Sequence, residues 1–294
     1  MNKATLKENR IHGDPVYPVS VYPITCPPEE PLLDLHWHDE LEFLLVTEGK
    51  ALFRVDVSNY EVQAGEAIFV NAGELHSGYV VGEKPCSFLA VVFHPDLLGA
   101  GSVDIVQDRY IQPLVQHKYN VPVHITRNTE PERDVLSMLY QLFDANQNKQ
   151  NAHELTTKGL LYLSLSKLLM LGKPVQRESK LGAGNHNIDR LKTIVEYIEN
   201  RYSEQIQLQD LAGLASMSES YFCRFFKKIT TKSPIEYINQ YRVQQAAFML
   251  KKSDKKIMEI ALDVGFNNVS YFNTVFKQRF GCTPAAYRKR DLGA

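Results

Sequence analysis

The sequence has no apolar run near the length of about 18 residues that a membrane-spanning helix requires. Its first ten residues also lack the basic and then apolar order of a secretory signal peptide. Cysteine is scarce, with 4 residues in 294, and none is paired at a metal-binding spacing. We therefore expect a cytoplasmic protein with no membrane partner, and we assign the cysteines no chemistry.

A strong excess of either charge is also missing, because the formal net charge is −1. The balance is nevertheless uneven along the chain. From His186 to Ala294 there are 17 Lys and Arg against 11 Asp and Glu, a net charge of +6, whereas the preceding residues carry 16 and 23, a net charge of −7. A positive excess favours a polyanion such as double-stranded DNA as the partner of the later part. The length and the hydrophobic content of 44% predict two folded domains.

The last part of the chain contains an internal repeat, in which residues 210–237 recur as residues 259–287. The residues that reappear 50 positions later are Tyr221, Phe222, Phe226, Lys227, Pro234 and Tyr237, which match Tyr271, Phe272, Phe276, Lys277, Pro284 and Tyr287. Each copy has helical apolar spacing, an interruption and then helical spacing again. This order predicts two helix-turn-helix motifs, at residues 208–230 and 257–280.

The turn and capping residues repeat together with the apolar ones. Gly265 suits a sharp turn between helices because glycine readily adopts a positive φ. Ser218 and Asn268 occupy equivalent positions and are predicted to cap the second helix of each motif. Ser233 and Thr283, each followed by proline, are predicted to begin the next helix.

The apolar stripe of each second helix must face its own core, which leaves eight side chains as candidates for contacts to DNA. They are Ser220, Cys223, Arg224, Lys227, Ser270, Asn273, Thr274 and Lys277. Arginine can donate two hydrogen bonds to guanine, asparagine can pair with adenine, and lysine suits phosphate. The alternative is that these side chains only solvate the helices.

The first part of the chain is a series of short β-like runs, separated by glycine and asparagine, that predicts an antiparallel barrel or sandwich. The runs are Leu32–His38, Leu41–Thr47, Ala51–Val57, Glu66–Val70 and Ser87–Phe93. The preceding residues 1–31 contain six prolines. We expect these residues to form an extended arm.

A histidine-rich pattern lies within these runs. His36 and His38 share one face of a strand because strand side chains alternate, and Glu42 can join them. With His76, this pattern resembles the two cupin motifs, although Glu30 and Asn71 replace the usual glycine and proline. The resemblance implies a divalent transition metal held by the four residues, or a small molecule held directly by them. The remaining histidines are expected on the surface or in loops: His12, His94, His117, His124, His153 and His186.

Two helical patterns follow, at about residues 132–146 and 153–171. The second is too apolar for a helix with one buried face, so it needs a second covering surface. That surface is either its own barrel or a second copy of the chain. Residues 172–187 have no apolar periodicity and are predicted to be a linker.

The repeat resembles the AraC-type transcription regulators, through Ile260-Ala261, Gly265-Phe266, Tyr271-Phe272, Phe276-Lys277 and Thr283-Pro284. The first copy departs from the family by lacking glycine at Ser216 and Thr231, and Cys223 stands where a polar base contact is usual. The resemblance implies a long helix over residues 234–251 that sets the two motifs into successive major grooves, roughly 34 Å apart.

The resemblance also implies the domain order of an α+β multidomain protein. We expect an arm at residues 1–31, a cupin-type effector-binding barrel at 32–130, a helical dimerisation segment at 131–171, and a DNA-binding domain at 188–294. The expected function is a homodimeric, ligand-responsive regulator that binds rather than catalyses, activates transcription with RNA polymerase, and senses a sugar or sugar derivative. Two alternatives are a metal-dependent cupin enzyme with a DNA-binding tail and a dimerising scaffold that binds no ligand.

Overall fold

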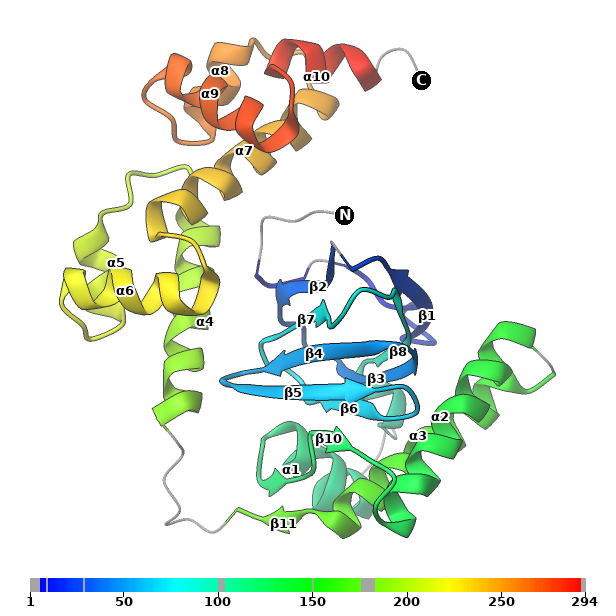
Figure 1. Ribbon diagram of the computed structural model, residues 1–294. Coiled ribbons are helices and arrows are strands. Elements are labelled where there is room, and N and C mark those ends of the chain that lie inside the picture. The colour runs from blue at the N-terminus through cyan, green and yellow to red at the C-terminus, as the bar shows by residue number, and fades with distance from the viewer. Residues whose placement is uncertain are drawn as a thin grey trace. The chain divides into compact units, whose positions relative to one another are not determined.

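The computed structural model describes residues 6–8, 10–28, 30–99, 104–149, 151–175 and 183–291. The chain divides into two compact units, one with residues 7–184 and the other with residues 1–6 and 185–294 (Figure 1). The first is rich in strands and the second is helical, which confirms the α+β multidomain class. Within the described residues, no helix has the length and apolar character needed to cross a membrane.

The first unit is built on two antiparallel sheets. The larger sheet has the order β1 (Val19–Cys26), β8 (Cys86–Phe93), β3 (Leu41–Glu48), β6 (Ala67–Val70) and β10 (His124–Ile125). The smaller sheet has the order β2 (Pro31–His36), β7 (His76–Val80), β4 (Lys50–Val55) and β5 (Ser58–Gln63). A separate pair joins β9 (Tyr119–Asn120) to β11 (Lys173–Pro174). Each of the five predicted runs contains a strand, and the additional strands are β1, β5, β7 and the two-residue β9, β10 and β11.

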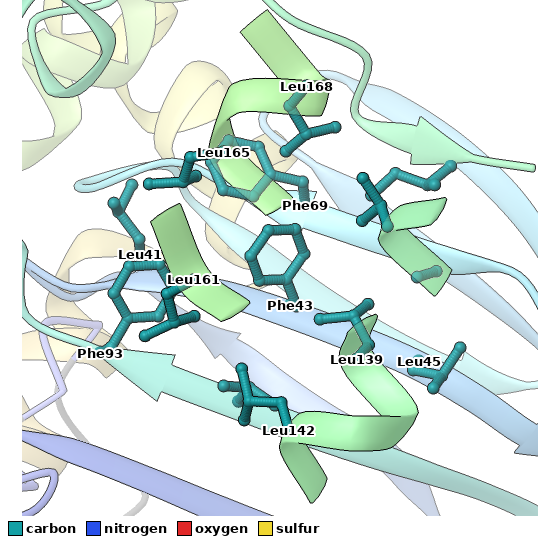
Figure 2. Close-up of a cluster of buried hydrophobic side chains, with 14 of the residues drawn as sticks. Leu41, Phe43, Leu45, Phe69, Phe93, Leu139, Leu142, Leu161, Leu165 and Leu168 are labelled. Atoms are coloured by element: carbon teal, nitrogen blue, oxygen red, sulfur yellow. The ribbon is translucent and has the colours of Figure 1, made fainter. Parts of the chain in front are cut away.

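Strand β3 divides two hydrophobic cores because its side chains alternate between the faces of the sheet. Leu41, Phe43 and Leu45 belong to the core that the larger sheet forms with two helices (Figure 2). Leu44 and Val46 belong to the core between the two sheets. Glu42 has the same parity as Leu44, so its carboxylate enters the barrel interior rather than the helix-covered face.

Helices α2 (Glu130–Asn148) and α3 (His153–Leu171) cover the outer face of the larger sheet (Figure 2). On α3, the side chains buried in this core include Leu161, Leu165 and Leu168. Other apolar side chains of the same helix are exposed: Leu155, Leu163 and Met170. One face of α3 therefore packs on its own barrel, and a second apolar face is left open within the described part of the chain. Three short elements precede these helices: η1 (Pro95–Leu98), η2 (Gln107–Ile111) and α1 (Gln112–Val115).

The expectation of an extended arm over residues 1–31 is wrong for residues 19–26, which form β1. Pro23 is tolerated there because β1 lies at the edge of its sheet, where one side needs no backbone N–H partner. The linker predicted over residues 172–187 is also too long at both ends. Residues 173–174 pair with β9, and α4 begins at Ala183, while residues 176–182 lie outside the described chain.

Helices are the only regular secondary structure among the described residues of the second unit. They are α4 (Ala183–Arg201), α5 (Leu208–Leu214), α6 (Glu219–Thr230), α7 (Pro234–Lys252), α8 (Ile257–Asp263), α9 (Val269–Phe280) and α10 (Pro284–Asp291). Helices α5 and α6 form one helix-turn-helix motif, α8 and α9 form the other, and the long helix α7 joins them. The repeated phenylalanines have equivalent roles, because Phe222 and Phe226 are fully buried, as are Phe272 and Phe276.

The turn between α8 and α9 requires glycine for two reasons. Gly265 has a φ of +92°, and a Cβ at this position would lie 2.7 Å from the Tyr202 carbonyl oxygen and 2.9 Å from Nε of Arg242. Arg242 is held there because its Nε donates to the same carbonyl at 2.7 Å. At the start of α9, the Asn268 side chain accepts a hydrogen bond from the backbone N–H of Tyr271, which confirms this predicted cap. Ser218 stands at the equivalent N-cap position of α6, but its side chain makes no capping hydrogen bond.

Candidate functional site

Three histidines and one glutamate meet inside the first unit. His36 at the end of β2 is registered with His76 at the start of β7, while Glu42 comes from β3 of the other sheet. His38 lies in the connection between β2 and β3. One ligand atom from each residue lies within 4.8 Å of the others. The structure thus brings together all four of the predicted effector or metal ligands.

The three imidazole rings are oriented by backbone carbonyl groups. Nδ1 lies 2.7 Å from the Asp34 carbonyl oxygen in His36, 3.1 Å from that of Glu40 in His38, and 2.9 Å from that of Glu74 in His76. A carbonyl oxygen only accepts hydrogen bonds, so each Nδ1 carries the hydrogen. In the neutral rings each Nε2 then offers a lone pair, as in metal-binding histidines whose other nitrogen donates to the backbone.

The Glu42 carboxylate is the negative charge of this cluster. Its Oε2 lies 3.2 Å from Nε2 of His38 and 3.0 Å from Nε2 of His76, and its side chain is only 5% exposed. Burial raises the pKa of a carboxyl, but His38 and His76 outweigh this effect and hold the pKa of Glu42 well below its usual range. Burial likewise lowers the pKa of His38, but Glu42 reverses the shift and raises that pKa. The Glu42 carboxylate therefore favours the protonated form of His38.

The Nε2 atoms of His76 and His36 favour a metal ion rather than a proton in this cluster. Nε2 of His76 is buried, and its 3.0 Å approach to Glu42 Oε2 does not have the geometry of a hydrogen bond, so among the described residues this nitrogen has an ionic neighbour but no hydrogen-bond partner. Burial, followed by the neighbouring His76, lowers the pKa of His36 to about 4, so this ring stays neutral at pH 7. Lone pairs directed at a buried carboxylate are unfavourable unless a cation lies between them. Imidazole nitrogens with a carboxylate suit a divalent transition metal, so these residues fit such an ion.

The predicted DNA contacts lie on the second helix of each motif. Seven of them are exposed: Ser220, Arg224 and Lys227 on α6, and Ser270, Asn273, Thr274 and Lys277 on α9. Cys223 is only half-buried. The buried phenylalanines on the opposite side of each helix fix this orientation. The structure makes the side chains available, and which of them read bases stays a prediction.

Comparison with known families agrees with both units. A family model described as AraC-like ligand binding domain matches residues 18–165, and a helix-turn-helix domain model matches residues 211–290. The chain belongs to the AraC family of transcription regulators. The first match includes β1, in agreement with the strand that replaces the predicted arm.

AraC-type relatives match along nearly the whole chain. YdeC of Bacillus subtilis (strain 168), named an uncharacterized HTH-type transcriptional regulator, is 28% identical over 288 residues, 97% of each chain. RhaS of Enterobacter sp. (strain 638), named an HTH-type transcriptional activator, is 25% identical over 95% of this chain and 96% of its own. The DNA-binding domain of AdpA, solved with a target DNA, is 32% identical over 34% of this chain and 91% of its own, with a TM-score of 0.33.

Two residues beside the cluster of this AraC-type regulator were missed by the sequence analysis. Glu8 Oε2 lies 3.5 Å from Nε2 of His36 and 3.3 Å from Nε2 of His12. His12 lies in a loop, as one of the two predicted alternatives has it, but it is buried, with only 5% of the residue exposed. Neither residue belongs to a motif, and only the fold brings them near His36. Four of the other histidines are at least partly exposed: His94, His117, His124 and His153. The side chain of His186 lies outside the described residues.

Proposed function

We propose that this protein is a cytoplasmic, homodimeric transcription activator that responds to a small molecule held in its barrel. The observation that carries the proposal is the convergence of His36, His38, Glu42 and His76 in a chain that also bears two helix-turn-helix motifs. The cluster is the input and the motifs are the output. No step of this function requires a bond to be made or broken.

Within this proposal, the four residues hold a divalent transition metal. His36, His38 and His76 would contribute Nε2, and Glu42 would contribute a carboxylate oxygen. When bound, such an ion supplies open coordination positions for oxygen donors of a small molecule. The backbone carbonyls at the three Nδ1 atoms would keep the rings in place, as outer contacts do in other metal sites.

The effector that we propose is a sugar or a sugar derivative. Its hydroxyl oxygens can bind a metal ion held by the cluster. Its hydroxyl groups can also form hydrogen bonds directly with the imidazole and carboxylate groups. One relative of this chain, RhaS of Enterobacter, is named a transcriptional activator. An activator would also contact RNA polymerase, which makes the polymerase a proposed partner.

Regulation then requires a difference in affinity between two arrangements of the dimer. The effector must bind the DNA-competent arrangement more tightly than the incompetent one, since equal affinity shifts nothing. Couplings of this kind are typically about 5- to 150-fold in affinity. The exposed apolar face of α3, with Leu155, Leu163 and Met170, is the surface that we propose for the dimer contact.

A pair of variants tests the proposal. A panel of sugars and sugar acids is first screened for thermal stabilisation of the full-length protein, with and without Zn²⁺ or Mn²⁺. A DNA site is then selected in vitro, and its Kd is measured with and without the best stabilising compound. His76→Ala is expected to keep basal DNA binding and lose the response. Arg224→Ala is expected to keep stabilisation by the effector and lose DNA discrimination.

Three outcomes contradict the proposal in different ways. A panel without any stabilising compound would favour a scaffold that binds no ligand. An undiminished response in His76→Ala would remove the cluster from the sensing role. Turnover of a compound by the metal-loaded protein, abolished in His76→Ala, would favour a cupin enzyme with a DNA-binding tail.

A further inference from the structure

The segment that precedes β1 is attached to the barrel beside the histidine cluster. Lys7 forms a parallel bridge with Trp37, and the backbone N–H of Glu8 donates to the Trp37 carbonyl oxygen at 2.8 Å. Nζ of Lys7 also lies 2.9 Å from the Asp39 carboxylate. Trp37 stands between His36 and His38 in the sequence. This attachment therefore fixes the position of Glu8 relative to both histidines.

The Glu8 side chain is directed toward the cluster. Its Oε2 lies 3.5 Å from Nε2 of His36 and 3.3 Å from Nε2 of His12. His12 is held in turn by the Tyr22 hydroxyl group, 3.1 Å from its Nδ1. Glu8 thus has one fixed neighbour on its own segment and one in the cluster.

His36 marks the open side of the cluster. Its side chain is 17% exposed, whereas those of His38, Glu42 and His76 are at most 5% exposed. Glu8 lies on this side. The Nε2 atoms of His38 and His76 lie 3.2 Å and 3.0 Å from Glu42, whereas Nε2 of His36 has Glu8 as its neighbouring carboxylate. A second carboxylate would also bring the charge of the ligand set to −2, matching a divalent cation.

We propose that Glu8 is a fifth ligand of the ion held by His36, His38, Glu42 and His76. This inference rests on the metal site of the proposed function. It adds a ligand from a different segment, so the ion ties the segment that carries Glu8 and His12 to the barrel. His12 is the positioning residue, because its Nε2 holds the Glu8 carboxylate on the His36 side.

Metal affinity in the full-length protein tests this assignment. Chelator-treated wild type and Glu8→Gln are titrated with Zn²⁺ against a chromophoric chelator. The matched control is Glu61→Gln, which also removes one negative charge but lies in β5, where Glu61 pairs with Lys50. We expect the Zn²⁺ Kd of Glu8→Gln to rise at least about tenfold, while that of Glu61→Gln stays within about twofold.

A second measurement separates a ligand from a residue that only supports the fold. Hydrogen exchange at the Glu8 amide, which donates to Trp37, is followed with and without Zn²⁺. Zn²⁺ is expected to slow this exchange in wild type and not in Glu8→Gln. Glu8→Asp, which keeps a carboxylate, is expected to retain part of the Zn²⁺ affinity that Glu8→Gln loses. This variant keeps the assignment testable if Glu8→Gln folds poorly.

The outcomes distinguish this inference from the proposed site itself. If wild type binds one Zn²⁺ per chain and Glu8→Gln binds it equally well, the fifth-ligand assignment is wrong and the four-residue site stands. If the Zn²⁺ affinity of wild type is no higher than that of His76→Ala, both the fifth-ligand assignment and the four-residue metal site are wrong.

Discussion

Thr231 and Gly281, 50 positions apart in the repeat, have the same left-handed backbone conformation, with φ of 64° and 70°. Each follows the second helix of its motif, and each backbone N–H donates to the carbonyl oxygen of the equivalent lysine, Lys227 or Lys277. Glycine adopts this conformation without strain, whereas threonine has a Cβ that crowds the backbone. The first motif therefore keeps the geometry of the second at an energetic cost.

Thr231→Gly should relieve that strain. We expect the free energy of unfolding of the helical unit to rise by about 0.5–1 kcal/mol, since part of the gain is lost to the greater freedom of glycine in the unfolded chain. Gly281→Thr should lower it by about 1 kcal/mol. Urea unfolding of the full-length protein, followed by circular dichroism, measures both variants. An unchanged or lower stability of Thr231→Gly would contradict this account of the helix end.

The two kinds of DNA contact should respond differently to mutation. Arg224→Ala and Asn273→Ala should each cost about 1–3 kcal/mol at the preferred site and little at unrelated sequences, because each would remove a base contact that we propose. Lys227→Ala should weaken binding to all sequences alike and lower the slope of log K against log salt concentration by about 1, because it would remove a phosphate contact that we propose. Fluorescence anisotropy at several salt concentrations measures both effects. Equal discrimination by Arg224→Ala and wild type would remove Arg224 from base reading.

The open face of α3 predicts a disruptable dimer. Leu163→Glu places a charge among the exposed apolar side chains, so the dimer Kd should rise by about tenfold or more, with little change in the melting temperature of the barrel. Lys84→Glu, on an exposed turn between β7 and β8, is the control and should leave the Kd unchanged. Analytical ultracentrifugation measures the association. A Leu163→Glu protein that associates as tightly as wild type would place the interface elsewhere.

Glu132 predicts a pH dependence of stability. Its carboxylate accepts hydrogen bonds from the backbone N–H and hydroxyl groups of Thr126 and Thr129, at 2.8–3.0 Å, and caps α2. Burial raises the pKa of Glu132, but these hydrogen bonds outweigh it and lower the pKa below its ordinary value of 4.5. A lowered pKa stabilises the fold above the ordinary value, and this contribution is lost as the pH falls through the pKa of the folded state.

Glu132→Gln should therefore be less stable than wild type by about 1–3 kcal/mol at pH 7. The difference should shrink as the pH falls below 4.5, because the protonated carboxyl then resembles the amide. Glu130→Gln, at the exposed first position of the same helix, is the control and should change little. A difference that is independent of pH would show that the charge of Glu132 is not what stabilises the cap.

The regular features of this protein could be predicted from its sequence, because short-range periodicity determines them. The β-like run Leu41–Thr47 and the matched Phe226 and Phe276 are local patterns, and the structure reproduces both. The approach of His36 to His76, which are 40 positions apart, was expected only from the resemblance to the two cupin motifs.

Features that depend on the edges of the fold were not predictable in the same way. Prolines in residues 1–31 indicated an arm, and only the sheet order shows that Pro23 lies in an edge strand. Glu8 and His12 carry no pattern of their own. Their position beside His36 follows from the pairing of Lys7 with Trp37, which no short-range signal encodes.

The central claim is that His36, His38, Glu42 and His76 form the ligand site of the sensor. Its most direct test is the metal content of full-length wild type and His76→Ala, measured by mass spectrometry after loading with Zn²⁺ and dialysis. The account predicts one tightly bound ion per wild-type chain and none in a folded His76→Ala protein. Equal metal content in the two proteins would contradict it.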